Sequence, residues 1–286
     1  MRCPQCPSGL RQFSRETGML NPDTFKSLVD ELYPTTSYIT LYFQGEPYLN
    51  KNFLKMVHYA ASKYMYTATS TNAHYLTKEQ AELTVNSGLD RLIISIDGVN
   101  QESYSKYRIG GNLEKVLEGT KNLMDAKKKL NSSTPHVIWQ FIVFSHNEAE
   151  LPEIKKLALE YELDELAIKT AQVYDFENSD SLLPENKQYS RYEKKGDKTV
   201  IKNKLLNHCW RLWNSCVVTW DGKVVPCCFD KDATYRLGTL ENNAFTQIWK
   251  NDAYKRFRTQ ILKGRKHIDI CRNCSEGTSI WKEWND

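Results

Sequence analysis

Short apolar runs alternate with amphipathic segments between Asn21 and about Lys169. The apolar runs predict five β-strands, at residues 38–43, 67–71, 91–96, 136–144 and 165–170. The amphipathic segments predict helices that begin near Pro22, Lys51, Thr77, Asn112 and Glu148. Because parallel strands joined by crossover helices produce this alternation, the pattern predicts an α/β fold.

Polar residues and glycines follow several of the predicted strands. They form the runs Gln44-Gly45-Glu46, Ser70-Thr71-Asn72, Ser95-Ile96-Asp97-Gly98 and Ser145-His146-Asn147. Ligands of parallel α/β proteins bind at the carboxyl ends of the strands, so together these runs are candidates for a functional site. Any single run is better explained by a turn that caps the next helix, and only the joint pattern favours a site.

The last part of the chain has a different composition. Residues 171–207 are polar and rich in Lys and Glu, which predicts a linker with some helix over 173–207. Residues 208–286 hold six of the eight cysteines and six of the seven tryptophans. We therefore expect a first domain over 1–172 and a small C-terminal domain over 208–286. The apolar core of the second domain is too small to fold without a bound metal or another cross-link.

Length and charge narrow the class of protein. The chain has 286 residues, 40% of them hydrophobic, which is enough for a substantial core. It has no apolar stretch of membrane-spanning length and no apolar signal region, so we expect a cytoplasmic protein without membrane contact. The net charge of +4 is dispersed, which does not indicate nucleic-acid binding. Cysteines of cytoplasmic proteins rarely form disulfides, so we expect these cysteines to bind a metal ion or a cluster.

The cysteines fall into two sets. Cys3-Pro4-Gln5-Cys6 alone fits a redox dithiol, half of a zinc site or part of a cluster loop, although no strand precedes it as in thioredoxin-type motifs. Cys209, Cys227, Cys271 and Cys274 offer four thiolates, which suit an iron-sulfur cluster or zinc.

The residues around the first two of these C-terminal cysteines predict a hairpin. Val217 to Val225 read as a β-hairpin that turns at Asp221-Gly222 and leads to Cys227. Cys216 and Cys228 are extra thiols, able to ligate or to be buried. The spacing of the cysteines alone does not exclude a zinc ribbon with a purely structural role.

Several motifs together resemble those of radical SAM enzymes. Cys3 to Gly9 resembles the end of their CxxxCxxC loop, and Gln44-Gly45-Glu46-Pro47 resembles their GGE motif with Gln in place of the first Gly. Thr71-Asn72 resembles their third-strand signature, and Ser95 to Gly98 followed by Tyr107-Arg108 resembles their fourth. The resemblance implies a partial (β/α)6 TIM-like barrel.

The C-terminal segment resembles the SPASM/twitch extension of this superfamily. The similarity runs from Cys209 through Asp221-Gly222 and Cys227-Cys228 to Cys271-x-x-Cys274. Since no cysteine follows Cys274, the twitch form with one auxiliary cluster fits better than a full SPASM domain with two. The resemblance thus implies a small cysteine-rich domain that holds an auxiliary 4Fe-4S cluster.

One cluster cysteine of the motif is missing. Counting back from Cys3, the first cysteine of CxxxCxxC would lie two residues before Met1, and the first barrel strand is missing as well. We expect the true reading frame to start upstream of Met1.

The resemblance implies a mechanism and a set of roles. In these enzymes three cysteines hold a 4Fe-4S cluster whose open iron binds S-adenosylmethionine, and electron transfer then releases a 5′-deoxyadenosyl radical that takes a hydrogen atom from the substrate. Cys3 and Cys6 would ligate that cluster, and Cys209, Cys227, Cys271 and Cys274 the auxiliary one. The S-adenosylmethionine site would comprise Gly45, Glu46, Ser70, Asn72, Ser95, Asp97 and Arg108.

The substrate is not specified by the sequence. Gln140, His146 and Lys169 are candidates on the substrate side, and the electron donor would be a protein such as flavodoxin or ferredoxin. Relatives of this type oxidise small molecules or modify peptides, and the lack of a visible leader-recognition domain favours a small molecule. The alternatives are a catalytically inactive truncated scaffold and a zinc-stapled binding protein.

Overall fold

The computed structural model describes residues 1–173 and 180–274, which form two compact units. The first unit holds Met1–Leu10 and the described residues of Thr36–Val200. The second holds Arg11–Thr35 and the described residues from Ile201 onward. The domain limits expected from the sequence, at 172 and 207, stay predictions, and the structure adds that residues 11–35 pack with the C-terminal unit.

A parallel five-stranded sheet is the centre of the first unit. Its strands follow one another in the order β1-β2-β3-β4-β5, with every neighbouring pair parallel. Their bounds are β1 Tyr38–Thr40, β2 Tyr66–Thr71, β3 Arg91–Ser95, β4 His136–Val143 and β5 Glu165–Thr170. The predicted α/β class and all five strands are confirmed, although β1 ends three residues before the predicted end at Phe43.

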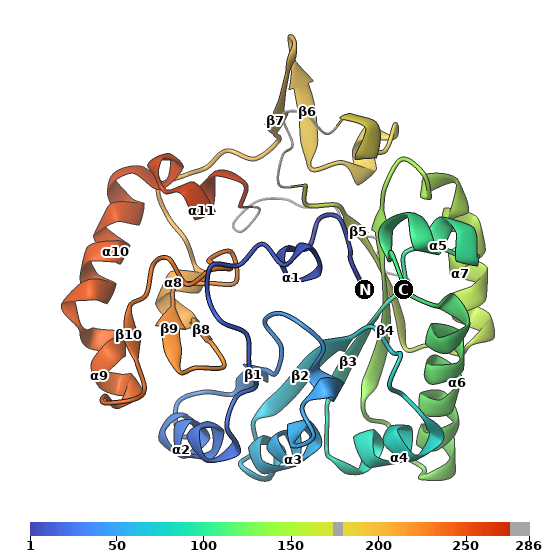
Figure 1. Ribbon diagram of the computed structural model, residues 1–286, viewed down its shortest axis with the longest axis horizontal. Helices are drawn as coiled ribbons and strands as arrows, with labels where there is room; N and C mark the ends of the chain where they lie inside the picture. The colour runs from blue at the N-terminus through green and yellow to red at the C-terminus, as the bar shows by residue number, and fades with distance from the viewer. Residues whose placement is uncertain (174–179, 275–286) are drawn as a thin grey trace. The chain divides into compact units, whose positions relative to one another are not determined.

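Helices lie along the outer face of this curved sheet, and the N-terminal segment with α1 (Pro7–Leu10) lies on its other side (Figure 1). The crossover helices are α3 (Phe53–Ser62), α4 (Lys78–Asn86), α6 (Leu113–Lys129) and α7 (Leu151–Glu160). Side chains cap two of them, since Thr77 accepts the backbone N–H of Gln80 and Asn112 accepts that of Lys115. Short 3-10 turns precede α3 and α7, at η1 (Pro47–Leu49) and η2 (Glu148–Glu150).

The sequence analysis missed helix α5 (Gln101–Tyr107). The helix has only seven residues and is polar except for its tyrosines, so it shows no apolar period. Its N-cap, Asn100, accepts the backbone N–H of Ser103 at 3.0 Å.

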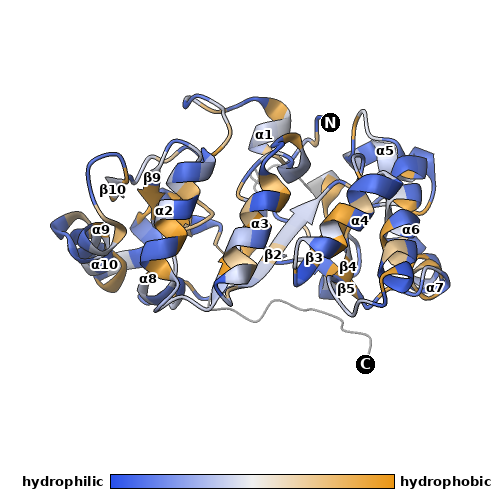
Figure 2. Ribbon diagram, turned by 90° about the horizontal axis from the view of Figure 1, so that it is seen from below, coloured by the Kyte–Doolittle hydropathy of each residue, from blue (hydrophilic) through white to orange (hydrophobic). Residues whose placement is uncertain are grey.

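The core of the first unit lies between the sheet and these helices. Leu92, Ile94, Trp139 and Phe141 face the helices and are fully buried, and each such side chain contributes about 1.5–3 kcal/mol through burial. Strand β2 is pale in the hydropathy colouring of Figure 2, because threonines fill its buried positions at 67, 69 and 71. Their hydroxyls are satisfied; that of Thr69, for example, donates to the Leu41 carbonyl at 3.1 Å.

Part of the expected linker forms a two-stranded sheet. Strands β6 (Tyr192–Lys195) and β7 (Lys198–Ile201) pair with each other, after the short 3-10 turns η3 (Asp180–Leu182) and η4 (Lys187–Tyr189). The Tyr192 hydroxyl donates to the Val173 carbonyl at 3.1 Å and ties this segment to the end of β5. The sequence analysis did not predict these two strands, because the runs Tyr-Glu-Lys-Lys and Lys-Thr-Val-Ile are short and show no clear alternation.

The second unit is built around a small antiparallel sheet with the order β10-β9-β8. Its strands are β8 (Val217–Val218), β9 (Lys223–Val225) and β10 (Gly238–Thr239), and its helices are α2 (Pro22–Leu32), α8 (Arg211–Asn214), α9 (Phe245–Lys250), α10 (Asp252–Gly264) and α11 (Asp269–Arg272). The predicted hairpin is confirmed, and its turn places Gly222 at φ +76°, a conformation that favours glycine.

Among the described residues, no helix is long and apolar enough to cross a membrane.

Helix α2 is part of the second unit by both packing and polar contacts. Leu28 lies in the same apolar cluster as Phe245 and Ile248. The Glu31 carboxylate accepts the backbone N–H groups of Phe245 and Thr246, each at 2.8 Å, and so caps the N-terminus of α9. Residues 11–35 thus complete the core of the cysteine-rich unit.

Candidate functional site

Four of the sequence-predicted residues share one face of the parallel sheet. Ser70 pairs with Ile93, and Ser95 pairs with Gln140, which pairs in turn with Ala167. Because successive side chains of a strand point to opposite faces, Ser70, Ser95, Gln140 and Lys169 lie on the face opposite the apolar core. This is the side on which the N-terminal cysteine segment lies (Figure 1).

Glu46 is held by donors from the end of β2. Its carboxylate accepts the Thr71 hydroxyl at 2.7 Å and the backbone N–H of Asn72 at 2.8 Å. It also caps the turn η1 by accepting the backbone N–H of Tyr48 at 3.3 Å. Burial raises the pKa of Glu46, and these hydrogen bonds only partly offset that. Gly45, just before it, has φ +84° and open space around the position of a Cβ.

His74 was not predicted, but it fixes the backbone of the predicted residue Asn72. The His74 Nδ1 lies 2.8 Å from the Asn72 carbonyl oxygen, and its Nε2 accepts the backbone N–H of Asn112 at 2.9 Å. Since Nε2 accepts, the proton sits on Nδ1, and the ring is a neutral bridge between the end of β2 and the start of α6. Burial lowers the pKa of His74, in agreement with the neutral form.

Asp97 and Arg108 form a buried ion pair beyond the end of β3. The Arg108 Nε donates to Asp97 Oδ2 at 2.5 Å, and the side chains are 13% and 0% exposed. The other Asp97 oxygen accepts the backbone N–H of Ile142 at 2.8 Å. Burial alone would lower the pKa of Arg108, but the neighbouring Asp97 carboxylate raises it. Its contacts with Arg108 and with the Ile142 backbone hold the Asp97 carboxylate in place.

Cys3 is the predicted cluster cysteine that lies closest to this pair. An Nη1 hydrogen of Arg108 points to the Cys3 sulfur at 3.9 Å, and Cys3 is 6% exposed. Burial raises the pKa of the Cys3 thiol, and the charge of Arg108 counteracts this. The backbone N–H of Cys6 donates to the Cys3 carbonyl, which turns the segment so that both thiols belong to one short loop.

Arg108 connects two of these groups by direct contact. It donates to Asp97 after β3 and points to the Cys3 sulfur of the N-terminal segment. Glu46 lies beside the end of β2, where Thr71 and Asn72 donate to it. The structure therefore brings these predicted residues together at the carboxyl edge of the sheet.

The predicted auxiliary ligands line one pocket of the second unit. Cys209, Cys227, Cys271 and Cys274 all border it, together with apolar side chains and Arg265. Cys216 and Cys228 do not border it, and Cys216 instead packs against the apolar cluster of the unit. Burial raises the pKa of Cys216 to about 12 and that of Cys271 to about 11. The pocket is thus bordered by the four predicted thiols and not by the two extra ones.

The donor set of this pocket fits an iron-sulfur cluster. Four thiols surround a hollow with an apolar lining, and thiolates are the ligands that such clusters require. Cys271 and Cys274 lie in one turn, in which the Cys274 backbone N–H donates to the Cys271 carbonyl at 3.1 Å, and Cys209 and Cys227 border the same pocket from other segments. In the part of the chain that the structure describes, no three His, Cys, Asp or Glu residues are gathered as a ready metal site, so the four thiols border one pocket without converging on one point.

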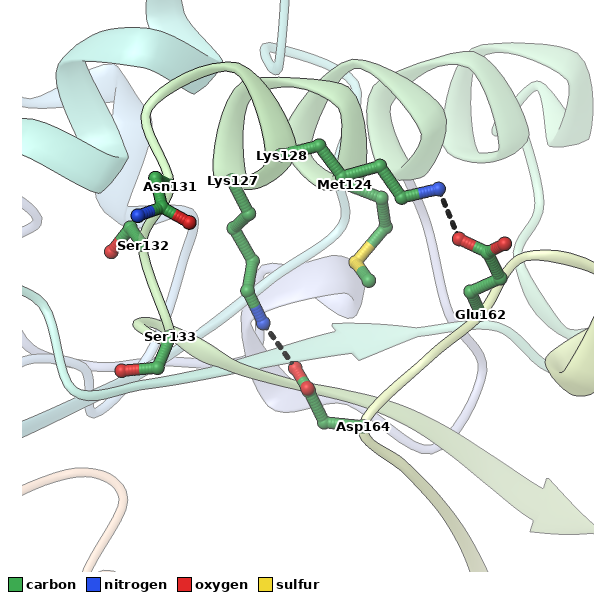
Figure 3. Close-up of a pocket in the computed structure, with 8 residues that line it drawn as sticks. All are labelled: Met124, Lys127, Lys128, Asn131, Ser132, Ser133, Glu162 and Asp164. Carbon is green, nitrogen blue, oxygen red and sulfur yellow. Dashed lines mark hydrogen bonds and ion pairs between the residues drawn. The ribbon is translucent and has the colours of Figure 1, made fainter.

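Another pocket lies at the opposite, amino-terminal end of the strands, and it has a structural explanation. Figure 3 shows Lys127 reaching down from α6 to Asp164, with Nζ 2.5 Å from the carboxylate. Asp164 also accepts the backbone N–H of Val137, at the start of β4. Lys128 pairs with Glu162 at the rim. None of the sequence-predicted site residues lines this pocket.

Two family models match this chain. Residues 1–158 match the model of the radical SAM superfamily, and residues 209–275 match that of SPASM, an iron-sulfur cluster-binding domain. The second match contains all six C-terminal cysteines.

Curated relatives are distant in sequence but similar in length. A tungsten-containing aldehyde ferredoxin oxidoreductase cofactor-modifying protein of Pyrococcus furiosus is 24% identical, over 96% of this chain and 84% of its own. An AdoMet-dependent heme synthase of Methanosarcina barkeri is also 24% identical, over 96% and 87%. An S-adenosyl-L-methionine-dependent 2-deoxy-scyllo-inosamine dehydrogenase of Niallia circulans is 22% identical, over 96% and 87%.

Solved structures share the fold. The structure of anSMEcpe with AdoMet and the Cp18Cys peptide has a TM-score of 0.66 and 15% identity, and covers 98% of this chain and 87% of its own. The structure of BtrN with AdoMet and 2-DOIA has a TM-score of 0.55 and 18% identity, and covers 97% and 88%. At these identities the likeness concerns the fold alone.

Proposed function

Because the chain belongs to the radical SAM superfamily and carries a SPASM domain, we propose that it reductively cleaves S-adenosylmethionine and oxidises a small organic molecule. Membership of the superfamily and the SPASM domain imply the cofactors. They are S-adenosylmethionine, a 4Fe-4S cluster that binds it, and an auxiliary iron-sulfur cluster. When bound, this set supplies a 5′-deoxyadenosyl radical that takes a hydrogen atom from the substrate.

The observation that carries the proposal is the group of charges around Arg108. At the carboxyl edge of the parallel sheet the Arg108 guanidinium donates to Asp97 and points to the Cys3 sulfur, and the Glu46 carboxylate is held at the same edge by Thr71 and Asn72. Substrates and cofactors of parallel α/β barrels bind at this edge. S-adenosylmethionine carries an amino group, a carboxylate and a sulfonium, so a site for it needs both acceptors and a cation.

The residues of this edge would have distinct roles. Cys3 and Cys6 would ligate the cluster, and Glu46 would accept the methionine amino group, because its carboxylate is already oriented by Thr71 and Asn72. Ser70, Asn72 and Ser95 would line the site from the ends of β2 and β3. Arg108 is bound to Asp97 through Nε, so it would set the charge beside the cluster and reach the methionine carboxylate only with its outer nitrogens.

The auxiliary site supports an oxidation. Cys209, Cys227, Cys271 and Cys274 would hold a 4Fe-4S cluster able to take an electron from the substrate radical, which turns hydrogen abstraction into a two-electron oxidation. The names of three curated relatives describe a 2-deoxy-scyllo-inosamine dehydrogenase, a heme synthase and a cofactor-modifying protein. These names support a small molecule over a peptide, although a fold relative was solved with a peptide.

The proposal includes a cellular setting. The reductive cleavage of S-adenosylmethionine needs a low-potential electron source, so the partner would be a flavodoxin or ferredoxin of the cytoplasm. The dispersed charge of the chain, +4 in total, gives no support to a nucleic-acid partner.

The test is the formation of 5′-deoxyadenosine and methionine from S-adenosylmethionine. Protein expressed from the full native reading frame would be reconstituted with iron and sulfide without oxygen, reduced with dithionite and analysed by chromatography and mass spectrometry. We expect both products, and their loss in C3A and C6A, whereas C228A keeps them. Addition of 2-deoxy-scyllo-inosamine, as a first polyol probe, tests for an increase in 5′-deoxyadenosine.

Two outcomes would contradict the proposal in different ways. Full iron content without 5′-deoxyadenosine would indicate a catalytically inactive scaffold. Zinc without iron would indicate a zinc-stapled binding protein.

A further inference from the structure

Arg265 is a buried cation at the wall of the four-cysteine pocket. It opens the turn η5 (Arg265–His267) after α10, and only 2% of it is exposed. One guanidinium nitrogen, Nη2, donates to the Cys274 sulfur at 3.0 Å. The other, Nη1, donates to the carbonyl oxygen of His208 at 3.1 Å, next in the chain to Cys209. Arg265 therefore links the segments of the first and last predicted ligands.

A buried guanidinium needs negative charge nearby. Moving a cation out of water costs several kcal/mol unless a partner compensates it. In the structure the Arg265 guanidinium instead donates to the Cys274 sulfur at 3.0 Å, at the wall of the four-cysteine pocket. A cluster ligated by thiolates in this pocket would place negative charge next to the guanidinium.

We propose that Arg265 raises the reduction potential of the auxiliary cluster and so makes this cluster an acceptor for the substrate electron. This inference rests on the proposed function of the four-cysteine site. A cluster with four thiolate ligands becomes more negative on reduction, and a fixed cation stabilises the more negative state. A hydrogen bond to a ligand sulfur acts in the same direction. Arg265 supplies both.

The shape of the side chain matters as well as its charge. An arginine presents several N–H groups in a rigid plane and can bind a sulfur and a carbonyl at the same time. A lysine at this position keeps the positive charge but has one nitrogen to share between Cys274 and the His208 carbonyl. Charge and hydrogen bonding can therefore be separated by comparing R265K with R265Q.

The test is a redox titration of the auxiliary cluster, followed by EPR of its reduced form. The full chain would carry C3A and C6A, so that the signal comes from the auxiliary site alone. R265Q removes the charge and keeps a donor, and R265K keeps the charge. R258Q is the matched control, because Arg258 lies on the neighbouring helix α10 and binds the Leu212 and Trp249 carbonyls without bordering the pocket.

We expect R265Q to lower the midpoint potential and R265K to lower it less. A tenfold change in the ratio of reduced to oxidised cluster at fixed potential corresponds to about 59 mV for one electron, and R265Q should reach at least that. R258Q should leave the potential unchanged. Each variant should contain as much iron and sulfide as the parent that carries C3A and C6A. Equal contents verify that the variant still assembles the cluster.

Equal potentials in R265Q, R258Q and the parent, at equal iron content, would overturn the inference and leave the proposed function intact. Loss of the cluster in R265Q together with an unchanged potential in R265K would also overturn it, because Arg265 would then serve assembly alone. Absence of any iron signal from the C3A and C6A parent would instead refute the auxiliary site itself.

Discussion

Arg108 donates to Asp97 through Nε at 2.5 Å while its Nη1 points to the Cys3 sulfur at 3.9 Å. One guanidinium thus connects the loop after β3 with the N-terminal cysteine segment. The relationship has a stability consequence as well as a functional one, because Asp97 is fully buried.

The variant D97N should destabilise the protein by about 3–5 kcal/mol, since it leaves the Arg108 charge buried without its partner. Thermal or urea denaturation of the reconstituted protein measures this. The control is D252N, whose carboxylate forms an exposed pair with Lys255 and should change stability by less than about 1 kcal/mol. Equal stability of the two variants would contradict the importance assigned to the Asp97–Arg108 pair.

Glu46 should show a trade-off between stability and binding. Its pKa is raised by burial above the ordinary 4.5, so the folded state binds more protons than the unfolded state just above that pH, and stability falls as pH rises through this window. E46Q removes that loss and should gain stability relative to the parent as the pH is raised from about 4 to 8. The measurement is the melting temperature of both proteins across this range.

The same variant should bind S-adenosylmethionine at least tenfold more weakly by calorimetry, because an amide cannot offer a full negative charge to the amino group. The control is E82Q, which alters only an exposed pair with Lys129. Tight binding by E46Q would assign Glu46 to the fold alone.

The two sets of C-terminal thiols should separate in an iron assay. C227A should lose the auxiliary cluster, about four irons per chain, because Cys227 borders the pocket. C228A and C216A should keep their iron, since neither thiol borders it. Retention of all iron in C227A, or its loss in C228A, would show that the ligand set is assigned wrongly.

Gly98 allows helix α5 to approach the loop that carries Asp97. A Cβ at this position would lie 2.4 Å from the backbone nitrogen of Tyr104 and 2.5 Å from the Ser103 hydroxyl. We expect G98A to cost about 1–3 kcal/mol in urea unfolding, because the backbone of α5 must shift. E102A, on the exposed side of the same helix, should cost less than about 0.5 kcal/mol.

The sequence predicted the strands of the parallel sheet well, because four of them have an apolar pattern and β2 is rich in β-branched threonines. It also predicted the hairpin at Asp221-Gly222, whose turn residues are a local signal. Helix α5 and the strands β6 and β7 were missed, since their residues are mainly polar and no local period identifies them.

For the candidate site, the sequence supplied the residues but not their partners. Glu46 and Asn72 were both named, yet only the structure shows that the Asn72 backbone orients the Glu46 carboxylate. His74 and Arg265 gave no signal, because a lone histidine and one arginine among 39 basic residues have no distinguishing spacing. Their roles arise from contacts across 38 residues, to Asn112, and nine residues, to Cys274.

The assignment of residues 11–35 to the cysteine-rich unit limits how this protein can be recombined. A C-terminal fragment cut at Cys209 would leave behind Leu28 and the Glu31 cap of α9, exposing an apolar groove where α2 packs. A graft of the auxiliary domain onto another barrel would therefore have to transfer two stretches of chain rather than one. We expect evolution to exchange the two units between proteins less readily than a domain formed by one continuous stretch of chain. The loop that holds Cys3 and Cys6 leads directly into residues 11–35, which belong to the second unit.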